Sequence, residues 1–255
     1  MKKFKWAEIA RSCSNVRFEV LSKYLKESGV DNEIEFIDVE PNEFKEVLDE
    51  RIKDFDAIRI GSPYGQLIPP LFQGQNAEIV KLKAADAMFK RESHWELQSA
   101  NLIGMNRIIH DYGRSFKKST AILIVGAGAG ARVAVSAFVK NGISNVKITN
   151  KFREQALDLI EDLKKYYFKV KFEFVPEDQL VSLPGANSIL INTTPLVPSN
   201  DILKELYYFN FLDSEGLVID FTVNPIDTPL VIAAEQIGIQ TIRGYEVSSW
   251  GDIHW

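Results

Sequence analysis

A glycine-rich segment near the middle of the chain carries the clearest chemistry. An apolar run from Thr120 to Val125 is followed by glycines at 126, 128 and 130 and by Ala131, where a helical pattern opens. A buried strand, a turn and a helix are the context in which a G-x-G-x-x-A spacing has physical meaning. The first glycine permits a tight turn, the second lets a pyrophosphate approach the backbone, and Ala131 lets helix and strand pack closely.

This spacing, with the N-terminus of the helix behind it, predicts a dinucleotide site, because unpaired N–H groups and the helix dipole attract phosphates. The alternative is a turn that serves only the packing of strand and helix and binds no nucleotide. The residues expected to bind the cofactor here are Gly126, Gly128, Ala129, Gly130 and Ala131.

The end of the next predicted strand bears on the choice of cofactor. A site for NAD would place Asp or Glu there, about 20 residues beyond the glycines, to bind the ribose 2′-hydroxyl. The chain has Asn150, Lys151 and Arg153 instead. Two cations without a carboxylate favour the 2′-phosphate of NADP, and we expect these three residues to bind it. Solvated surface charges without a ligand are the alternative.

Two later strands end in polar segments that could reach the same cofactor. One strand ends in Asn192, Thr193 and Thr194, and another ends in a segment from Asp220 to Pro225 that contains Val223. Ligands of open α/β sheets bind beyond the carboxyl ends of the strands. We therefore expect Asn192, Thr193, Thr194 and Val223 to flank the nicotinamide, although turns use the same residue types for structural reasons.

Composition narrows the possible partners. The chain has 255 residues, a formal net charge of −5 and one cysteine, Cys13. The negative charge favours neither nucleic acid nor an anionic membrane as a partner. No apolar run reaches the length of a membrane span. A single cysteine cannot form a disulfide within the chain, so we expect the protein in the reducing cytoplasm. The basic N-terminus has no apolar segment behind it and is not expected to be a signal peptide. The three histidines are scattered, so no metal site is expected.

The order of elements predicts an α/β fold with two domains. In residues 1–103, helices at 14–28, 42–52 and 72–82 alternate with strands at 34–39, 55–60, 84–89 and 95–98. Residues 104–243 hold a connecting helix, a polar link at 113–119 and a doubly wound parallel sheet, with strands at 120–125, 146–149, 170–175, 188–192, 217–220 and 240–243. Residues 244–255 are expected to form a short tail that returns towards the first domain.

These pieces resemble the shikimate dehydrogenase family over nearly the whole chain. The glycine-rich turn is similar to the family's GAGGAA, Asn150-Lys151 to its Asn-Arg-Thr, and Asn192–Pro195 to its Asn-Ala-Thr-Pro. The resemblance implies an N-terminal α/β substrate domain and a C-terminal NAD(P)-binding Rossmann domain. It also implies an NADP-dependent oxidoreductase of aromatic amino acid biosynthesis that acts on shikimate or a related hydroxy acid, as a monomer or homodimer.

The substrate half follows the family in layout. Ser12 and Ser14 fit the family's Ser-x-Ser, whose hydroxyls bind the substrate carboxylate. Arg59 begins the segment that stands in place of the family's Asn-Val-Thr-x-Pro-x-Lys, and a guanidinium can hold a carboxylate with two hydrogen bonds. The resemblance therefore implies that Ser12 and Ser14 bind the substrate, and we expect Arg59 to bind its carboxylate as an added cation.

The catalytic positions depart from the family. Gly65 stands where the catalytic lysine is expected, Asn101 stands at the catalytic aspartate, and Asp86 replaces an asparagine. Tyr64 is adjacent, but its reference pKa of about 10 makes it a poor base. Tyr64, Asp86 and Asn101 are the candidates for altered proton transfer. The alternative is a catalytically silent protein of the same fold that binds NADP or a metabolite.

Overall fold

The structure is a computed structural model that describes residues 3–112, 120–183, 185, 187–196, 200, 202–206 and 209–254. It divides into two compact units, one that reaches from Met1 to Ala100 and one from Asn101 to His254. The polar link expected at 113–119 and the last residue of the expected tail lie outside the described residues. Each unit is described by itself below.

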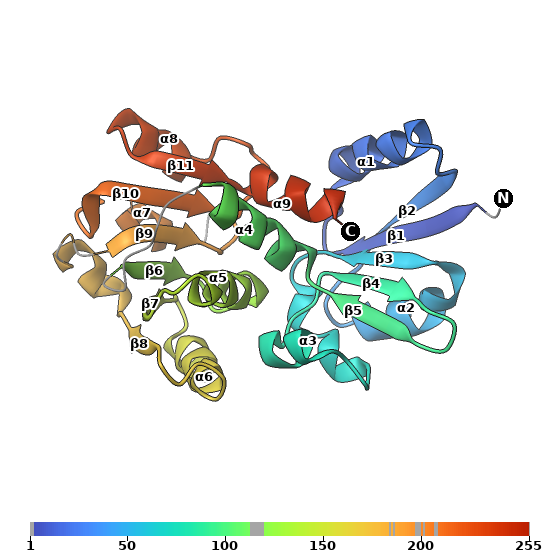
Figure 1. Ribbon diagram of the computed structural model, residues 1–255, viewed down its shortest axis with the longest axis horizontal. Helices are drawn as coiled ribbons and strands as arrows, with labels where there is room; N and C mark the ends of the chain where they lie inside the picture. The colour runs from blue at the N-terminus through green and yellow to red at the C-terminus, as the bar shows by residue number, and fades with distance from the viewer. Residues whose placement is uncertain are drawn as a thin grey trace. The chain divides into compact units, whose positions relative to one another are not determined.

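The first unit is a five-stranded sheet in the order β2-β1-β3-β4-β5 (Figure 1). Strands β1, β2 and β3 are parallel, whereas β4 pairs antiparallel with both β3 and β5. The strands are β1 (Phe4–Ala10), β2 (Asn32–Asp38), β3 (Ala57–Ile60), β4 (Ala87–Lys90) and β5 (Trp95–Gln98). The α-helices are α1 (Asn15–Glu27), α2 (Phe44–Arg51) and α3 (Ala77–Leu82), and short 3₁₀ turns are η1 (Ile52–Asp54), η2 (Tyr64–Gln66) and η3 (Pro69–Leu71).

Strand β1 is the main element that is not predicted from the sequence. It pairs with β2 on one side and β3 on the other, so it is an internal strand. Lys5 and Glu8 interrupt its apolar residues and hide the strand pattern. Only the folded sheet shows that Glu8 is buried with its apolar neighbours.

The two faces of this sheet bury different clusters, because successive side chains of a strand point to opposite sides. Ala7 and Ile9 of β1 join a core with Phe44 and Leu48 of α2. Trp6, on the opposite face, packs edge to face with Phe18 of α1, with 5.6 Å between the ring centroids. Glu8 follows Trp6 by two residues and therefore lies on the face that α1 covers.

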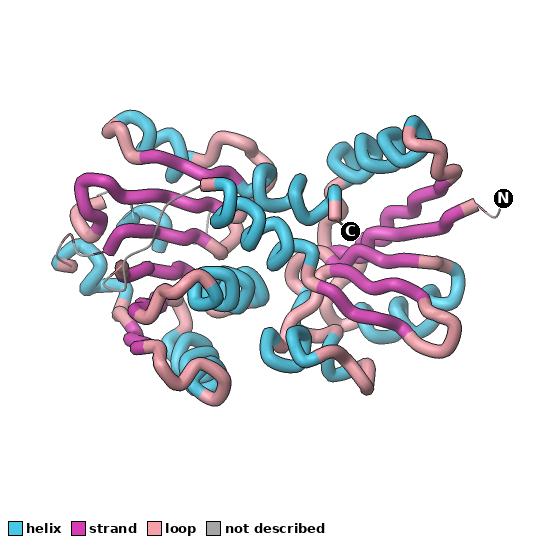
Figure 2. Tube along the Cα trace, viewed as in Figure 1, coloured by secondary structure: helices cyan, strands magenta, loops and turns pink. Residues whose placement is uncertain are grey.

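The second unit is a six-stranded sheet in the order β11-β10-β9-β6-β7-β8, and every strand pair in it is parallel (Figure 1). Figure 2 shows its strands in magenta and its helices in cyan. Its strands are β6 (Ala121–Val125), β7 (Asn145–Thr149), β8 (Lys171–Phe174), β9 (Asn187–Asn192), β10 (Leu212–Asp220) and β11 (Gln240–Arg243). Its helices are α4 (Ala100–Asp111), α5 (Ala129–Lys140), α6 (Arg153–Lys164), α7 (Ile202–Leu206), α8 (Pro229–Gln236) and α9 (Gly244–Ile253), with a 3₁₀ segment η4 (Glu177–Ser182).

The predicted doubly wound parallel sheet is confirmed. The chain runs outward from β6 through β7 to β8 and then returns to β9 on the other side of β6. The strand order therefore reverses between β6 and β9, and this is the switch point where such sheets bind ligands. All five residues of β6 are buried, which explains why its sequence reads as an uninterrupted apolar run.

The segment expected as a tail forms helix α9, which packs closely on α4 within the second unit. A Cβ added to Gly104 of α4 would lie 2.0 Å from the carbonyl oxygen of Val247 on α9. Only glycine permits this approach of the two backbones. The helices that the structure describes include none long and apolar enough to cross a membrane.

Candidate functional site

The glycine-rich turn joins β6 to α5 and is built around Gly126. This residue is buried with φ at +113°, a conformation that side-chain-bearing residues rarely adopt. A Cβ there would also lie 2.4 Å from Oγ1 of Thr193. Gly126 is therefore required by the protein's own packing, before any ligand is considered.

Helix α5 begins two residues earlier than the pattern predicts, at Ala129, and Gly128 is its N-cap. Gly128 is exposed and has no side chain with which to cap the helix. The amides of Ala129, Gly130 and Ala131 lie in the first turn, where backbone N–H groups have no partner within the helix. This N-terminus thus has the features that attract a phosphate group.

The tip of β9 packs directly on this turn. Thr193 donates hydrogen bonds from its amide and its hydroxyl to the carbonyl of Val125, at 2.9 and 2.7 Å. A Cβ on Gly130 would lie 3.0 Å from Cβ of Thr193 and 3.3 Å from the ring of Phe221. Small residues at 126 and 130 therefore let the ends of β9 and β10 approach the start of α5.

The tip of β7 lies beside the same turn, because the amide of Gly126 donates to the carbonyl of Thr149 at 2.9 Å. Asn150 holds the following residues in place through hydrogen bonds from Nδ2 to the carbonyl of Phe152 and to Oε1 of Gln155, at 2.9 and 3.2 Å. Lys151 and Arg153 are exposed. The chain therefore carries two cations in the segment that follows β7, beside the glycine-rich turn, whereas Asn150 mainly shapes this segment.

A buried hydrogen-bond network ties the ends of β9 and β10 together. Asn192, which is 1% exposed, donates to Oδ1 of Asp220 at 3.0 Å and accepts from both the amide and the hydroxyl of Thr194. Asp220 also accepts from the amide of Thr222 and the hydroxyl of Thr228. Asn192 is thus a positioning residue within the network.

Of the other residues expected at these two strand ends, Thr193, Thr194 and Val223 are half-buried and stand at the same edge of the sheet as the glycine-rich turn. Thr228 had no expected role in the site, although a Thr just before a helix is a recognisable capping signal.

In the first unit, two of the three expected substrate-binding residues converge on a carboxylate of the protein itself. Ser14 is the N-cap of α1, and its amide donates to Oε2 of Glu8 at 2.6 Å. Arg59 of β3 is directly opposite Glu8 in the strand register and is only 4% exposed. Ser12 is exposed. Glu8 was not expected at this site, and the signal for it is a single acidic residue within an apolar stretch.

Tyr64 does not fit the expected role in proton transfer. It is fully buried, its ring stacks on Phe44 at 4.1 Å, and its hydroxyl donates to the carbonyl of Val39. Burial, with a smaller effect from Glu40, raises the pKa of Tyr64. Both effects make it a still poorer base than an exposed tyrosine. Gly65 is also buried, and its carbonyl accepts a hydrogen bond from the amide of Ala85 at 2.8 Å.

Asp86 has a structural contact that accounts for its carboxylate. Its Oδ1 accepts a hydrogen bond from the amide of Ala100 at 2.6 Å, at the residue where α4 begins. Asn101 is the next residue of α4 and is half-buried. Asp86 therefore anchors the start of this helix through Oδ1, and it stays a catalytic candidate.

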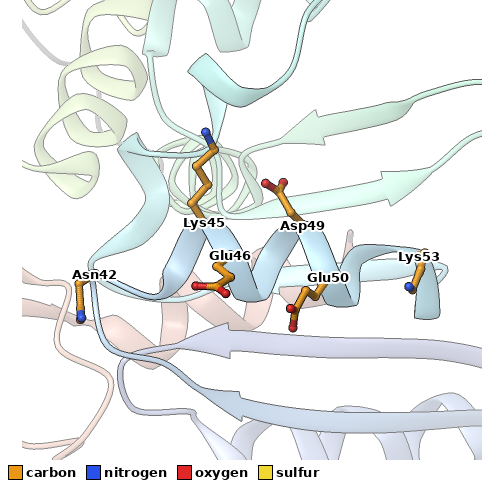
Figure 3. Close-up of a pocket in the computed structure, with 6 residues that line it drawn as sticks. All are labelled: Asn42, Lys45, Glu46, Asp49, Glu50 and Lys53. Atoms are coloured by element: carbon orange, nitrogen blue, oxygen red, sulfur yellow. The ribbon is translucent and has the colours of Figure 1, made fainter.

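One hollow in the first unit contains none of the predicted site residues. A hollow along α2 is lined by Asn42, Lys45, Glu46, Asp49, Glu50 and Lys53, whose side chains fan out on both sides of the helix (Figure 3). Its charges are of both signs and exposed, as on an ordinary solvated helix. Among the residues that the structure describes, no group of three or more His, Cys, Asp or Glu is placed to hold a metal ion.

The strand order, the switch point and the glycine-rich turn define the second unit as a Rossmann-type fold, the class of α/β fold that binds dinucleotides. The family described as shikimate / quinate 5-dehydrogenase matches residues 111–195. The chain is therefore similar to the shikimate dehydrogenase family, as its motifs predict.

Individual proteins extend this similarity beyond the matched segment. Shikimate dehydrogenase (NADP(+)) of Halothermothrix orenii is 21% identical over 217 residues, which are 82% of this chain and 74% of the relative. The corresponding protein of Archaeoglobus fulgidus is 27% identical over 79% of this chain and 75% of its own. The structure of quinate dehydrogenase from Corynebacterium glutamicum in complex with NAD superposes with a TM-score of 0.80, at 20% identity, over 99% of this chain and 92% of that protein.

Proposed function

We propose that the protein is an NADP-dependent oxidoreductase, similar to shikimate dehydrogenase, that acts on shikimate or a related hydroxy acid. The observation that carries the proposal is the meeting of four strand ends, those of β6, β7, β9 and β10, at the switch point of the second sheet. The names of the two relatives described above support NADP as the cofactor.

The residues at these strand ends suit NADP. The exposed Gly128 and the first amides of α5 would bind the pyrophosphate, and Lys151 with Arg153 would bind the 2′-phosphate. The chain offers no carboxylate in residues 150–153 that would repel this phosphate. Thr193, Thr194 and Val223 would border the nicotinamide, held in position by Asn192 and Asp220.

The reaction is the oxidation of a secondary alcohol to a ketone, or its reverse. NADP bound at the glycine-rich turn would supply the hydride acceptor for the carbinol carbon, and a base has to take the hydroxyl proton as the carbonyl bond forms. The chain's own residues have to bind the acid group, orient the carbinol and move this proton. Ser12, Ser14 and Arg59 are proposed for the acid group, and Asp86 and Asn101 remain as proton-transfer candidates.

A second function is supported by a specific observation at the catalytic positions. Gly65 has no side chain where the related enzymes are expected to have lysine, and the hydroxyl of Tyr64 is bonded inside the core. Both facts favour a silent protein that binds NADP or a metabolite without turnover. In either case we propose a small-molecule partner, a cytoplasmic location, and a monomer or homodimer without nucleic acid or membrane.

The two functions are separated by measuring NADPH formation from NADP with shikimate and with quinate, alongside calorimetric binding of NADP. The proposed enzyme forms NADPH only when substrate is present, and Gly128→Val abolishes this signal. NADP binding without turnover of either acid would favour the silent protein. Failure to bind NADP at all would contradict both.

A further inference from the structure

Glu8 is a buried carboxylate in the unit proposed to bind substrate. It lies on the internal strand β1 and is 3% exposed. Its Oε2 accepts the hydrogen bond from the amide of Ser14 at the start of α1. Gly61 follows β3, and a Cβ there would lie 2.5 Å from Cβ of Ala10 and 3.3 Å from Oε1 of Glu8, so the close packing on Ala10 keeps side-chain atoms away from the carboxylate. The position at the N-terminus of α1 thus accommodates one carboxylate already.

Positive charge surrounds this carboxylate from two elements. Arg59 of β3 is opposite Glu8, and Arg17 of α1 is the second cation that acts on it. Their guanidinium carbons lie 5.4 and 4.7 Å from the ring centre of Phe18. The anion position therefore consists of a helix N-terminus and two arginines, which is the chemistry that recognises a carboxylate.

The remaining polar groups near Glu8 come from the loop before α1 and from β2. The thiol of Cys13 donates to the carbonyl of Glu8 at 3.5 Å, and the amide of Cys13 donates to Oδ1 of Asp38 at 2.7 Å. Burial and the charge of Glu8 raise the pKa of the Cys13 thiol to about 12, so it stays neutral at ordinary pH.

Burial also raises the pKa of Glu8, against the opposing effects of the Ser14 hydrogen bond, Arg17 and Arg59. Glu8 is thus a carboxylate whose ionisation the protein disfavours.

Ser14 and Arg59 are also the residues proposed to bind the acid group of the substrate, so two carboxylates would share one site. Like charges at close range in a buried site cannot both ionise without a large cost. We propose that Glu8 determines acid specificity: it competes for the anion position formed by Ser14 and Arg59, and a substrate carboxylate binds there only when Glu8 is protonated. This inference rests on the proposed substrate-binding role of the first unit.

The proposal predicts the sign of the pH dependence. Above the pKa of Glu8, each bound carboxylate requires the uptake of one proton, so affinity for an acid rises as pH falls. Glu8→Gln removes the competing charge and keeps an oxygen that can accept from Ser14. Its affinity for shikimate at alkaline pH should be about 10- to 100-fold tighter than that of the wild type and nearly independent of pH.

The test is calorimetric titration of shikimate in buffers of different ionisation enthalpy, which counts protons taken up on binding. We expect about one proton per shikimate in the wild type and none in Glu8→Gln. The matched control is Glu19→Gln, which removes an exposed carboxylate from α1 and should behave as the wild type. The proton count of the wild type tests the proposal even if Glu8→Gln does not fold.

The outcomes separate this inference from the proposed function. Binding of shikimate without proton uptake in the wild type, or equal affinity in Glu8→Gln, overturns the role of Glu8 whether or not NADPH forms. Absence of shikimate binding in both proteins overturns it as well. Proton-coupled binding of shikimate without any NADPH formation supports the role of Glu8 and contradicts the oxidoreductase function.

Discussion

Replacement of Gly126 by alanine tests whether glycine is required at this position by the packing of the protein itself. The new Cβ would meet Oγ1 of Thr193 at 2.4 Å and Cγ2 of Thr194 at 3.1 Å, and φ at +113° would be strained for alanine. Positive φ costs a non-glycine residue about 1–2 kcal/mol, and overpacking costs about 1–3 kcal/mol. We expect Gly126→Ala to lower the free energy of unfolding by about 2–5 kcal/mol.

Gly142 provides a matched control in the same unit. Its φ is +94°, and a Cβ there would meet nothing within 4 Å. Gly142→Ala should therefore cost only the strain, about 1–2 kcal/mol. The difference between the two variants isolates the contact with the tip of β9.

The assay is urea unfolding followed by circular dichroism, together with hydrogen exchange of peptides that contain β6 and β9. Gly126→Ala should also speed exchange at the amide of residue 126, which donates to Thr149 in the wild type, and at the amide of Thr193. If Gly126→Ala is no less stable than Gly142→Ala, the close contact with Thr193 is not a constraint and the packing argument fails.

Three further predictions concern the cofactor and the cysteine. Lys151→Ala should weaken NADP binding about tenfold and leave NAD binding unchanged. The control, Lys164→Ala, changes another exposed lysine and should affect neither cofactor. Equal affinity of the wild type for both cofactors would refute the choice of NADP. Gly128→Val should keep the circular dichroism spectrum, because φ of −87° suits any residue, but should lose NADP affinity; normal binding would mean that the turn is empty. The pKa of Cys13 is about 12 in the folded protein, against an ordinary 9.0, so less of the thiol is ionised there. Iodoacetamide should therefore alkylate Cys13 at least about tenfold more slowly in the folded protein than in urea, even though a thiolate of higher pKa is more nucleophilic. Equal rates would contradict the burial of the thiol.

Much of the second unit could be predicted because its signals are local. A buried parallel strand such as β6 is apolar throughout, and the glycines that follow it are spaced by the geometry of one turn. Alternation of strands and helices then implies a parallel sheet without knowledge of any distant contact. The cations at 151 and 153 could be located for the same reason, since they directly follow a strand of this sheet.

The roles of individual side chains could not be predicted in this way. Tyr64 is a candidate for proton transfer in the sequence, but its stacking on Phe44 and its hydrogen bond to Val39 exist only in the folded core. The sequence predicts Asn192 as a ligand-facing residue, but its side chain is bonded in the folded protein to Asp220, 28 residues away.

Sequence alone determined the α/β class and the doubly wound sheet, and it predicted the place of a dinucleotide site, because periodicity and turn chemistry act between near neighbours in the chain. Only the tertiary structure decided that β1 is an internal strand and that Glu8 is buried on it. A carboxylate in an apolar strand is unfavourable by itself, and it becomes acceptable only where Ser14 and Arg17 at the start of α1, together with Arg59 of β3, supply a hydrogen bond and positive charge.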